Sequence, residues 1–215
     1  IALTFKPMTG VSGDFYDFYM NNKGLSGIGL FDVSGHGVAS GLITMVSKRI
    51  IDKNFNENLQ NEFHETFNST NKELLKELKD MDNYLTGIML RIEKNSISYI
   101  NAGHPELLIK SGNTVKQALK ANNTSISGTF LGAFFKQKIE YESLSFSVKQ
   151  NDYILLYSDC LIEANDSNND IYGIQRLSES FANAPNGSAE EVMNHLLHDF
   201  YNFISKNSPL QDDLT

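Results

Sequence analysis

The order of strand-like and helix-like patterns constrains the fold of this 215-residue chain more than any other feature. Three short runs rich in aromatic and β-branched residues come first and predict strands. They cover residues 3–6, 14–19 and 25–31. After Gly37 the spacing of apolar residues changes to that of a helix, and two helices follow in succession over 38–53 and 58–79. Because helix pairs do not alternate with single strands, the pattern excludes a doubly wound parallel sheet.

The rest of the chain repeats this organisation. Strands are predicted over 84–93, 96–101, 107–110, 139–148 and 153–157. The polar segment 117–129 is predicted to be a loop, and Ser188 with Glu191 forms a capping box that opens a last helix. The prediction is therefore a single domain over residues 1–215, of the α/β class in its α+β form, with antiparallel strands and paired helices.

Charge and cysteine content exclude several classes of function. The formal net charge is −8, which argues against nucleic acid as a partner because phosphate backbones bind clustered Lys and Arg. The single cysteine, Cys160, excludes a disulfide framework and a cysteine-rich zinc site. No apolar run approaches the ~20 residues of a membrane span and no signal peptide opens the chain, so we expect a cytoplasmic domain without membrane contact. Because the chain begins with Ile1 rather than Met, we expect it to be a fragment of a longer protein.

Acidic residues stand at the ends of predicted strands in three places and again at the end of the chain. The four segments are Gly13–Asp17, Asp32–Gly37, Ser158–Cys160 and Asp212–Thr215. A carboxylate beside a buried apolar strand is costly unless its charge is matched, and a divalent cation is the usual match for several converging carboxylates. A single Asp after a strand is more often a turn former or a helix cap. Four such segments with Gly or Ser neighbours favour a metal site.

Six motifs, taken in this order, resemble those of a known family. They are G-D-F-Y-D, D-V-S-G-H-G-V-A-S-G, N-A-G-H-P, L-Y-S-D-C-L-I-E-A, Y-G-I-Q-R-L and D-D-L-T. The set resembles the motifs of bacterial metal-dependent serine/threonine phosphatases of the protein phosphatase 2C-like family, in its SpoIIE and RsbU branch. The resemblance covers nearly the whole chain. It implies a four-layer αββα sandwich in which helix pairs flank two antiparallel sheets.

The resemblance also implies a two-metal site. By motif position, Asp14 binds one ion, Asp32 bridges both ions, and the carbonyl of Val33 completes the second site. Asp159 and Asp212 match the two carboxylates of the other ion. Hard oxygen ligands suit Mn²⁺ or Mg²⁺. Two such ions activate a water for in-line attack on a phosphate monoester, so no side-chain nucleophile is required.

Four more residues lie in or beside these motifs. Asp213 fills a neighbouring position and is expected to tune bound water. Asp17 is either part of the site or structural. His36 lies near the place where eukaryotic relatives keep a proton-donating His, and its catalytic role is left open. His104 either lines the substrate approach or braces its turn, and we favour bracing.

Cys160 stands where many members of the family have Gly. A thiolate beside the carboxylate of Asp159 is disfavoured by repulsion between like charges. We therefore expect a neutral thiol packed in the turn.

The branch also suggests what the domain acts on and what it contacts. The implied substrate is a phosphorylated protein, an anti-sigma factor antagonist. In the 38–53 helix the predicted core stripe is Val38, Leu42, Met45, Val46, Arg49 and Ile50. Ile43 and Ile51 are left over, and we expect them to contact a second copy of the domain or a sensor helix. The alternative function is a catalytically weak domain of the same fold that binds a partner and signals without turnover.

Two other motifs suggest binding sites that we do not favour. Gly35–Gly41 reads G-x-G-x-x-x-G, which resembles a dinucleotide-binding turn, but no strand ends in an acidic residue about 20 residues later. Asp166–Asp170 resembles a calcium loop, but Ile171 and Leu177 occupy the positions that require Gly and an acidic residue. We interpret the first as tight packing at a strand-to-helix corner and the second as a solvated loop.

Overall fold

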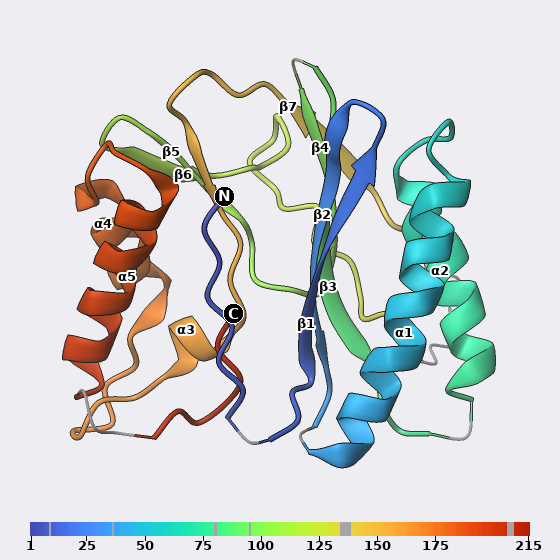
Figure 1. The fold of residues 1–215 in the computed structure, drawn as a ribbon, viewed down its shortest axis with the longest axis horizontal. Helices are drawn as coiled ribbons and strands as arrows, with labels where there is room; N and C mark the ends of the chain where they lie inside the picture. The colour runs from blue at the N-terminus through green and yellow to red at the C-terminus, as the bar shows by residue number, and fades with distance from the viewer. Residues whose placement is uncertain (9, 36, 80, 95, 134–138, 206–208) are drawn as a thin grey trace.

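The computed structural model describes residues 1–215 except 9, 36, 80, 95, 134–138 and 206–208. This part of the chain forms four layers, with a helix pair on each outer side and two sheets between them (Figure 1). Within each sheet, every pair of neighbouring strands is antiparallel. The α+β class and the αββα sandwich predicted from the sequence are therefore confirmed.

The larger sheet carries the first two acidic motifs. Its strands are β1 (Asp14–Asn21), β2 (Gly24–Val33), β3 (Leu85–Ile92), β4 (Ile97–Ala102) and β7 (Ser143–Phe146), in the order β1-β2-β3-β4-β7. In the β1–β2 hairpin Asp14 lies opposite Asp32, and in the β2–β3 pair Thr86 lies opposite Asp32. The register thus brings these three polar residues together at one end of the sheet.

The smaller sheet carries the third acidic motif. Its strands are β5 (Leu108–Ser111), β6 (Thr114–Gln117) and β8 (Tyr153–Leu155), in the order β6-β5-β8. Asp159 follows β8 and immediately precedes the short helix α3 (Cys160–Glu163). The predicted carboxylates therefore come from both sheets.

Two helix pairs cover the outer faces of the sheets. Helices α1 (Val38–Glu57) and α2 (His64–Glu77) lie on the larger sheet, and α4 (Gly173–Asn183) and α5 (Ala189–Phe203) lie on the smaller one (Figure 1). The predicted capping box of α5 is confirmed, because the Ser188 hydroxyl accepts from the Glu191 N–H at 3.2 Å and the Glu191 carboxylate accepts from the Ser188 N–H at 2.7 Å. None of the helices in the described ranges is long and apolar enough to cross a membrane.

Three hydrophobic clusters fill the spaces between the layers. The first joins the larger sheet to α1 and α2, the second joins the smaller sheet to α4 and α5, and the third lies between the two sheets. Their members include, in that order, Phe31 and Phe67, Leu177 and Phe200, and Leu30 and Tyr99. Because side chains alternate along β2, neighbouring residues such as Leu30 and Phe31 serve different clusters.

The predicted buried face of α1 is mostly wrong, because Ile50 is its only buried member. Val38, Leu42 and Met45 are 71%, 62% and 72% exposed, whereas Ile43 and Ile51, which we expected to be free for a partner, are buried. The buried residues of α1 are Ser40, Ile43, Ser47, Ile50, Ile51, Asn54 and Phe55. Small and polar residues interrupt this face, so the spacing of apolar residues alone selected the wrong side of the helix.

Several predicted elements also have different bounds. Residues 3–6 form no strand and make only a bridge from Lys6 to Leu214, while the run 139–148 is a strand only in β7. Helix α2 begins at His64, later than the predicted start at 58. The short strand β6 and helix α4 were not predicted as separate elements.

Candidate active site

Asp14 and Asp32 lie opposite each other at the open end of the β1–β2 hairpin, on the face of the sheet that also carries Leu30. This face packs against the second sheet. Asp14 is 3% exposed and Asp32 is half-buried. Asp17 occupies the opposite face, where its carboxylate lies 3.4 Å from Nζ of Lys48 in α1. The structure thus separates Asp17 from the carboxylates at the motif ends.

A close backbone contact joins the first motif to the second. The Val33 N–H donates to the Gly13 carbonyl at 3.2 Å, and a Cβ on Gly13 would lie 2.8 Å from the Val33 carbonyl oxygen. Glycine is required at this position because any side chain would collide with the carbonyl that is predicted to bind metal. The Thr44 hydroxyl of α1 donates to the same Gly13 carbonyl at 3.2 Å. This bond connects the helix to the region around Asp14 and Asp32, called the carboxylate centre below.

The C-terminal motif reaches the centre from the other side. The Thr215 hydroxyl donates to the Asp14 carboxylate at 2.7 Å. The Ser158 N–H donates to the Thr215 carbonyl at 3.0 Å, and the Thr215 N–H donates to the Ser158 hydroxyl at 3.0 Å. Since Ser158 immediately precedes Asp159, these bonds place the third motif beside the first.

The carboxylate of Asp213 holds the turn before β1. It accepts hydrogen bonds from the Met8 N–H at 2.7 Å, the Ser12 hydroxyl at 2.7 Å and the Gly13 N–H at 2.8 Å. These contacts position the first motif, and the role of Asp213 in tuning bound water stays a prediction. The neighbouring Asp212 side chain is exposed and accepts only from the Asp213 N–H, at 2.8 Å, among its bonds in the described residues.

Burial and mutual repulsion raise the pKa values of these carboxyls. Burial raises the pKa of Asp14 to about 7, and the charges of Asp213 and Asp159 raise it further. Hydrogen bonds from Thr215 and Ser158 lower the same pKa but do not offset the burial. Asp14 is therefore partly protonated near neutral pH when no cation is bound.

Asp32 is shifted further. Burial raises its pKa to about 8, and the charges of Asp14, Asp159, Asp212 and Asp213 add to the shift. Burial also raises the pKa of Asp159. No ion pair in the described ranges neutralises any of these groups. Asp14, Asp32 and Asp159 therefore lie in one region with raised pKa values and without a neutralising ion pair among the described residues.

Comparison with known proteins agrees with this arrangement. The sequence model of the family described as Stage II sporulation protein E (SpoIIE) matches residues 22–215. The chain belongs to the SpoIIE family. Among its relatives, the phosphoserine phosphatase RsbP of Bacillus subtilis (strain 168) is 29% identical in an alignment of 160 residues that covers 71% of this chain and 37% of RsbP. The SpoIIE-family chain thus spans little more than a third of the length of this curated relative.

Solved structures share the fold at low sequence identity. The SiaA-PP2C domain of Pseudomonas aeruginosa matches with a TM-score of 0.83 at 18% identity, covering 98% of this chain and 81% of that one. RsbX, solved in complex with magnesium, matches with a TM-score of 0.61 at 13% identity, covering 98% of this chain and 89% of RsbX. The SpoIIE-family domain described here therefore has the PP2C fold.

The donors of the SpoIIE-family centre fit a hard divalent cation. The predicted donors are the carboxylates of Asp14, Asp32, Asp159 and Asp212 with the carbonyl of Val33, all of them oxygen ligands. The uncompensated burial of Asp14 and Asp32 fits the same class of ion. Within the described ranges, however, no group of three or more His, Cys, Asp or Glu side chains is close enough to hold an ion. The predicted ligands lie in one region, but their side chains are not close enough together to coordinate an ion.

The predictions for Cys160, His104 and His36 have different outcomes in the structure. Cys160 is buried, its Sγ donates to the Asp212 carbonyl at 3.3 Å, and burial raises its pKa to about 12, so the predicted neutral thiol is confirmed. His104 is 4% exposed and hydrogen-bonds within its own turn, which agrees with bracing rather than with lining an approach. His36 lies outside the described residues.

Sequence reasoning missed four hydroxyl residues at this centre, namely Ser12, Thr86, Ser158 and Thr215. Ser158 and Thr215 lie within the quoted motifs, and Ser12 immediately precedes the first of them, so a signal was available for these three. Thr86 carries no motif signal, since it approaches Asp32 only through the register of β2 with β3.

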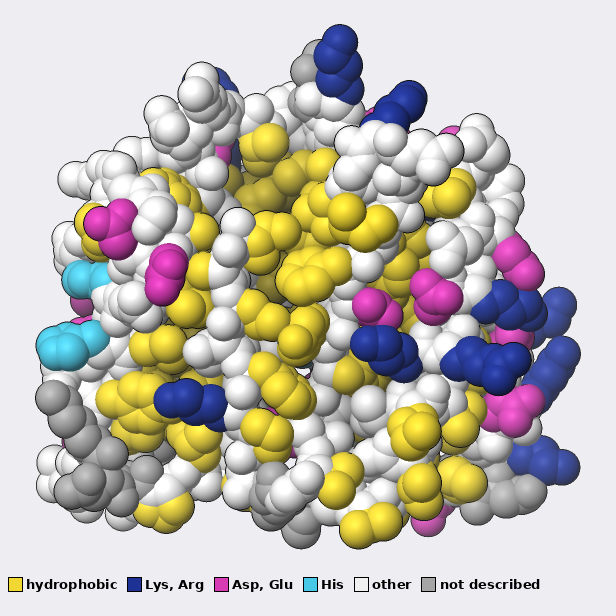
Figure 2. Space-filling model, viewed as in Figure 1, with side chains coloured by type: hydrophobic (Ala, Val, Ile, Leu, Met, Phe, Trp, Pro, Cys, Tyr) yellow, Lys and Arg dark blue, Asp and Glu magenta, His cyan; other side chains and the backbone are white. Residues whose placement is uncertain are grey.

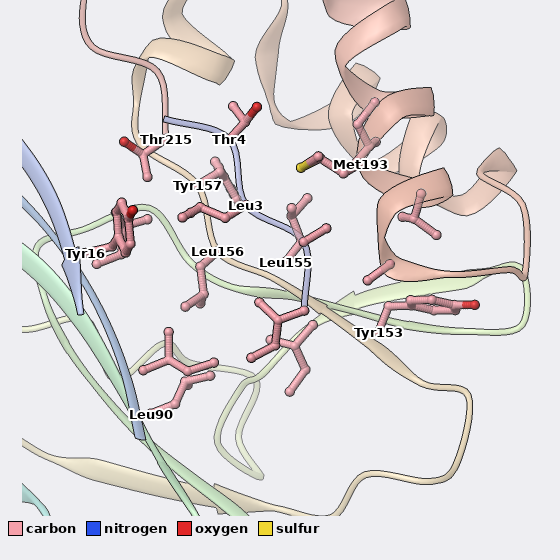
Figure 3. Close-up of a pocket in the computed structure, with 18 of the residues that line it drawn as sticks. Leu3, Thr4, Tyr16, Leu90, Tyr153, Leu155, Leu156, Tyr157, Met193 and Thr215 are labelled. Atoms are coloured by element: carbon pink, nitrogen blue, oxygen red, sulfur yellow. The ribbon is translucent and has the colours of Figure 1, made fainter. Parts of the chain in front are cut away.

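An apolar pocket of about 470 Å³ lies between the larger sheet, β8 and α5. Tyr16, Leu90, Leu155 and Met193 line it together with Leu3 of the N-terminal segment (Figure 3). Figure 2 shows hydrophobic side chains gathered across this middle part of the molecule. None of the four predicted acidic ligands lines the pocket, but Tyr157 and Thr215 do, so the pocket reaches the edge of the candidate active site.

Proposed function

We propose that this domain is a metal-dependent phosphatase that hydrolyses phosphoserine or phosphothreonine on a regulatory protein. The juxtaposition of Asp14 and Asp32 carries the proposal, because two carboxyls without a counter-ion lie at one end of a hairpin in the PP2C fold. Such an arrangement disfavours folding and is typical of functional sites. The alternative, a signalling domain without turnover, offers no reason to keep this pair buried.

The acidic motifs would hold the ions. Asp14, Asp32, Asp159 and Asp212, with the carbonyl of Val33, are the proposed ligands of two Mn²⁺ or Mg²⁺ ions, and Asp32 serves both. When bound, such ions lower the pKa of a bridging water and offset charge on the phosphoryl oxygens. Because the pKa of Asp32 is raised to about 8, ion binding releases its proton near neutral pH. The magnesium complex of RsbX supports the choice of a hard divalent ion.

Other residues of the centre position these ligands. Thr215 orients the carboxylate of Asp14, and Asp213 holds the turn that carries it. The hydroxyl of Ser158 is engaged with the C-terminal segment, and the thiol of Cys160 is neutral. The proposed reaction therefore uses water, rather than a side chain, as the nucleophile.

The proposed substrate is a phosphorylated protein of the anti-sigma factor antagonist type. The name of the relative RsbP, a phosphoserine phosphatase, and the resemblance to the SpoIIE and RsbU branch support this choice. Since regulators of transcription act in the cytoplasm, we expect the domain to work there. We also propose that residues 1–215 form a single catalytic domain at the C-terminal end of a longer protein, as the greater length of RsbP suggests.

Helix α1 provides a proposed contact surface for regulation. Its outer face exposes Val38, Leu42, Met45 and Val46, between 43% and 72% of each side chain. We propose that this face meets a second copy of the domain or a sensor segment of the same protein. Light scattering on the wild type and on Leu42→Glu distinguishes the two. A wild-type dimer that becomes monomeric in the variant identifies a second copy, and a monomer in both excludes a second copy and leaves the sensor segment as the proposed contact.

The decisive experiment measures phosphate release from a phosphoserine protein in Mn²⁺ and in EDTA. Asp32→Asn should lower turnover by at least about 100-fold, because it removes a charge that the proposed transition state requires. Asp17→Asn is the matched control, since Asp17 pairs with Lys48 on the other face of the sheet and should leave turnover nearly unchanged. Full activity in EDTA, or in Asp32→Asn, contradicts the proposal.

A further inference from the structure

His104 is a buried residue at the junction of the two sheets. It follows β4 in the turn Asn101–Pro105, where the Asn101 side chain accepts from the His104 N–H at 2.8 Å and donates to the His104 carbonyl at 2.9 Å. Gly103 supplies the left-handed backbone of the turn with a φ of 69°. These bonds fix the backbone of His104 in the turn.

One edge of the ring meets the larger sheet. Nδ1 of His104 lies 2.8 Å from the hydroxyl of Thr86, a hydrogen-bond distance. Thr86 lies opposite Asp32 in the β2–β3 register, and residues paired in this way share a face of the sheet. His104 therefore contacts Thr86, the residue that is paired with Asp32 across the two strands.

The other edge of the ring meets the segment that follows β8. Burial lowers the pKa of His104 to about 3, although the nearby backbone of Tyr157 acts to raise it. The ring is thus neutral and carries one proton. Placing this proton on Nε2 lets the Thr86 hydroxyl donate to Nδ1 and directs the N–H toward the Tyr157 backbone. Nε2 completes no hydrogen bond of good geometry in the described part of the chain.

Tyr157 precedes Ser158 and Asp159, the residues that carry the third acidic motif. We propose that His104 is a positioning residue of the carboxylate centre, which holds Thr86 beside Asp32 from its buried place at the junction of the two sheets. The inference rests on the proposed function, since it gives these carboxylates a shared ion. In an arrangement with ligands from two sheets, the separation of the sheets determines whether the ligands reach one ion together.

Metal affinity tests this role independently of turnover. Calorimetric titration with MnCl₂ compares the wild type with Thr86→Val, which removes the hydroxyl at nearly constant shape, and Thr86→Ser, which keeps it. Loss of a residue that orients a ligand typically weakens metal binding by about 10- to 100-fold, so Thr86→Val should show a loss of about tenfold and Thr86→Ser should bind nearly as the wild type does. Thr70→Val is the control, because its buried hydroxyl lies in α2 and should not affect Mn²⁺ binding.

A double-mutant cycle assigns the effect to the contact with His104. His104→Phe keeps an aromatic ring and loses both polar edges. Because the two residues would act as one unit, adding Thr86→Val to His104→Phe should weaken Mn²⁺ binding no further. The ¹⁵N shifts of the His104 ring in the wild type should show the proton on Nε2. Where His104→Phe does not fold, the comparison of Thr86→Val with Thr86→Ser decides.

The failure of this inference differs from the failure of the proposed function. If folded Thr86→Val and His104→Phe bind Mn²⁺ as tightly as the wild type does, His104 only braces its turn and the positioning role is overturned while metal dependence stands. If the wild type itself binds neither Mn²⁺ nor Mg²⁺, both the proposed function and this inference are wrong.

Discussion

The hydroxyl of Thr215 donates a 2.7 Å hydrogen bond to the carboxylate of Asp14, across 201 residues of sequence. This bond ties the last residue of the chain to the first strand of the larger sheet. It also leaves the carboxylate with a defined orientation at the centre. If Asp14 binds an ion as proposed, the segment Asp212–Thr215 contributes to metal affinity as well as to stability.

Removal of this bond should weaken metal binding. Thr215→Val replaces the hydroxyl with a methyl group of similar size, so Asp14 loses its donor without a large change in packing. We expect Mn²⁺ affinity to fall by about tenfold, as is typical when a partner that orients a ligand is lost. Thr215→Ser retains the donor and should restore affinity in the same titration. Equal affinities for the three proteins would show that Asp14 needs no orienting partner.

The stability of the metal-free domain should fall as pH rises. Asp14 and Asp32 have folded pKa values of about 7 and about 8 against 3.8 for the free group, so the folded state binds more protons than the unfolded state in this window. Their contribution is fully present below pH 3.8 and is lost as pH rises through 7 and 8. The buried His104 acts in the opposite direction, but only below its free value of 6.5. Urea unfolding in EDTA should therefore give a lower free energy at pH 8.5 than at pH 6.5.

Two further measurements identify the groups responsible for this pH dependence. In saturating Mn²⁺ the trend should reverse, because protons and the cation compete for the same carboxyls. Asp32→Asn should flatten the dependence in EDTA, and Asp17→Asn should leave it unchanged. A metal-free domain that becomes more stable between pH 6.5 and pH 8.5 would contradict the assigned protonation.

Helix α1 should become more stable when a buried hydroxyl is removed. Ser47 is fully buried and its hydroxyl has no hydrogen-bond partner in the described residues. Ser47→Ala removes this unsatisfied group and improves helix propensity, so the free energy of unfolding should rise by about 1 kcal/mol. Ser40→Ala is the control, since the Ser40 hydroxyl donates to the Gly37 carbonyl at 2.9 Å and its loss should give no gain. Urea unfolding of both variants measures the difference.

Cys160 should be dispensable for hydrolysis. Its thiol has a pKa raised to about 12 by burial and donates to the Asp212 carbonyl, a bond that a serine hydroxyl can also make. Cys160→Ser should therefore leave phosphatase activity nearly unchanged, and Cys160→Gly should keep or raise it. Iodoacetamide should modify Cys160 only in the unfolded chain. Loss of activity in Cys160→Ser with Mn²⁺ binding intact would instead indicate chemistry at the cysteine.

Several features of this protein could be predicted from local sequence. The succession of strand runs and helix pairs predicted antiparallel sheets covered by helices, because each period reflects how one element buries its own apolar side. The capping box of Ser188 and Glu191 was predictable for a similar reason, since its two partners are three residues apart. The acidic motifs marked Asp14 and Asp32 because a charge at the end of an apolar strand is visible in the sequence itself.

Features that depend on distant parts of the chain were decided only by the tertiary structure. The buried side of α1 is the side that packs on the larger sheet, although it carries Ser47 and Asn54 and leaves Leu42 exposed. The sequence by itself determined which residues were candidate ligands. Tertiary structure decided which of them meet, which donors hold them and which pKa values rise, because burial and hydrogen bonding depend on segments about 200 residues apart in the chain, as between Asp14 and Thr215.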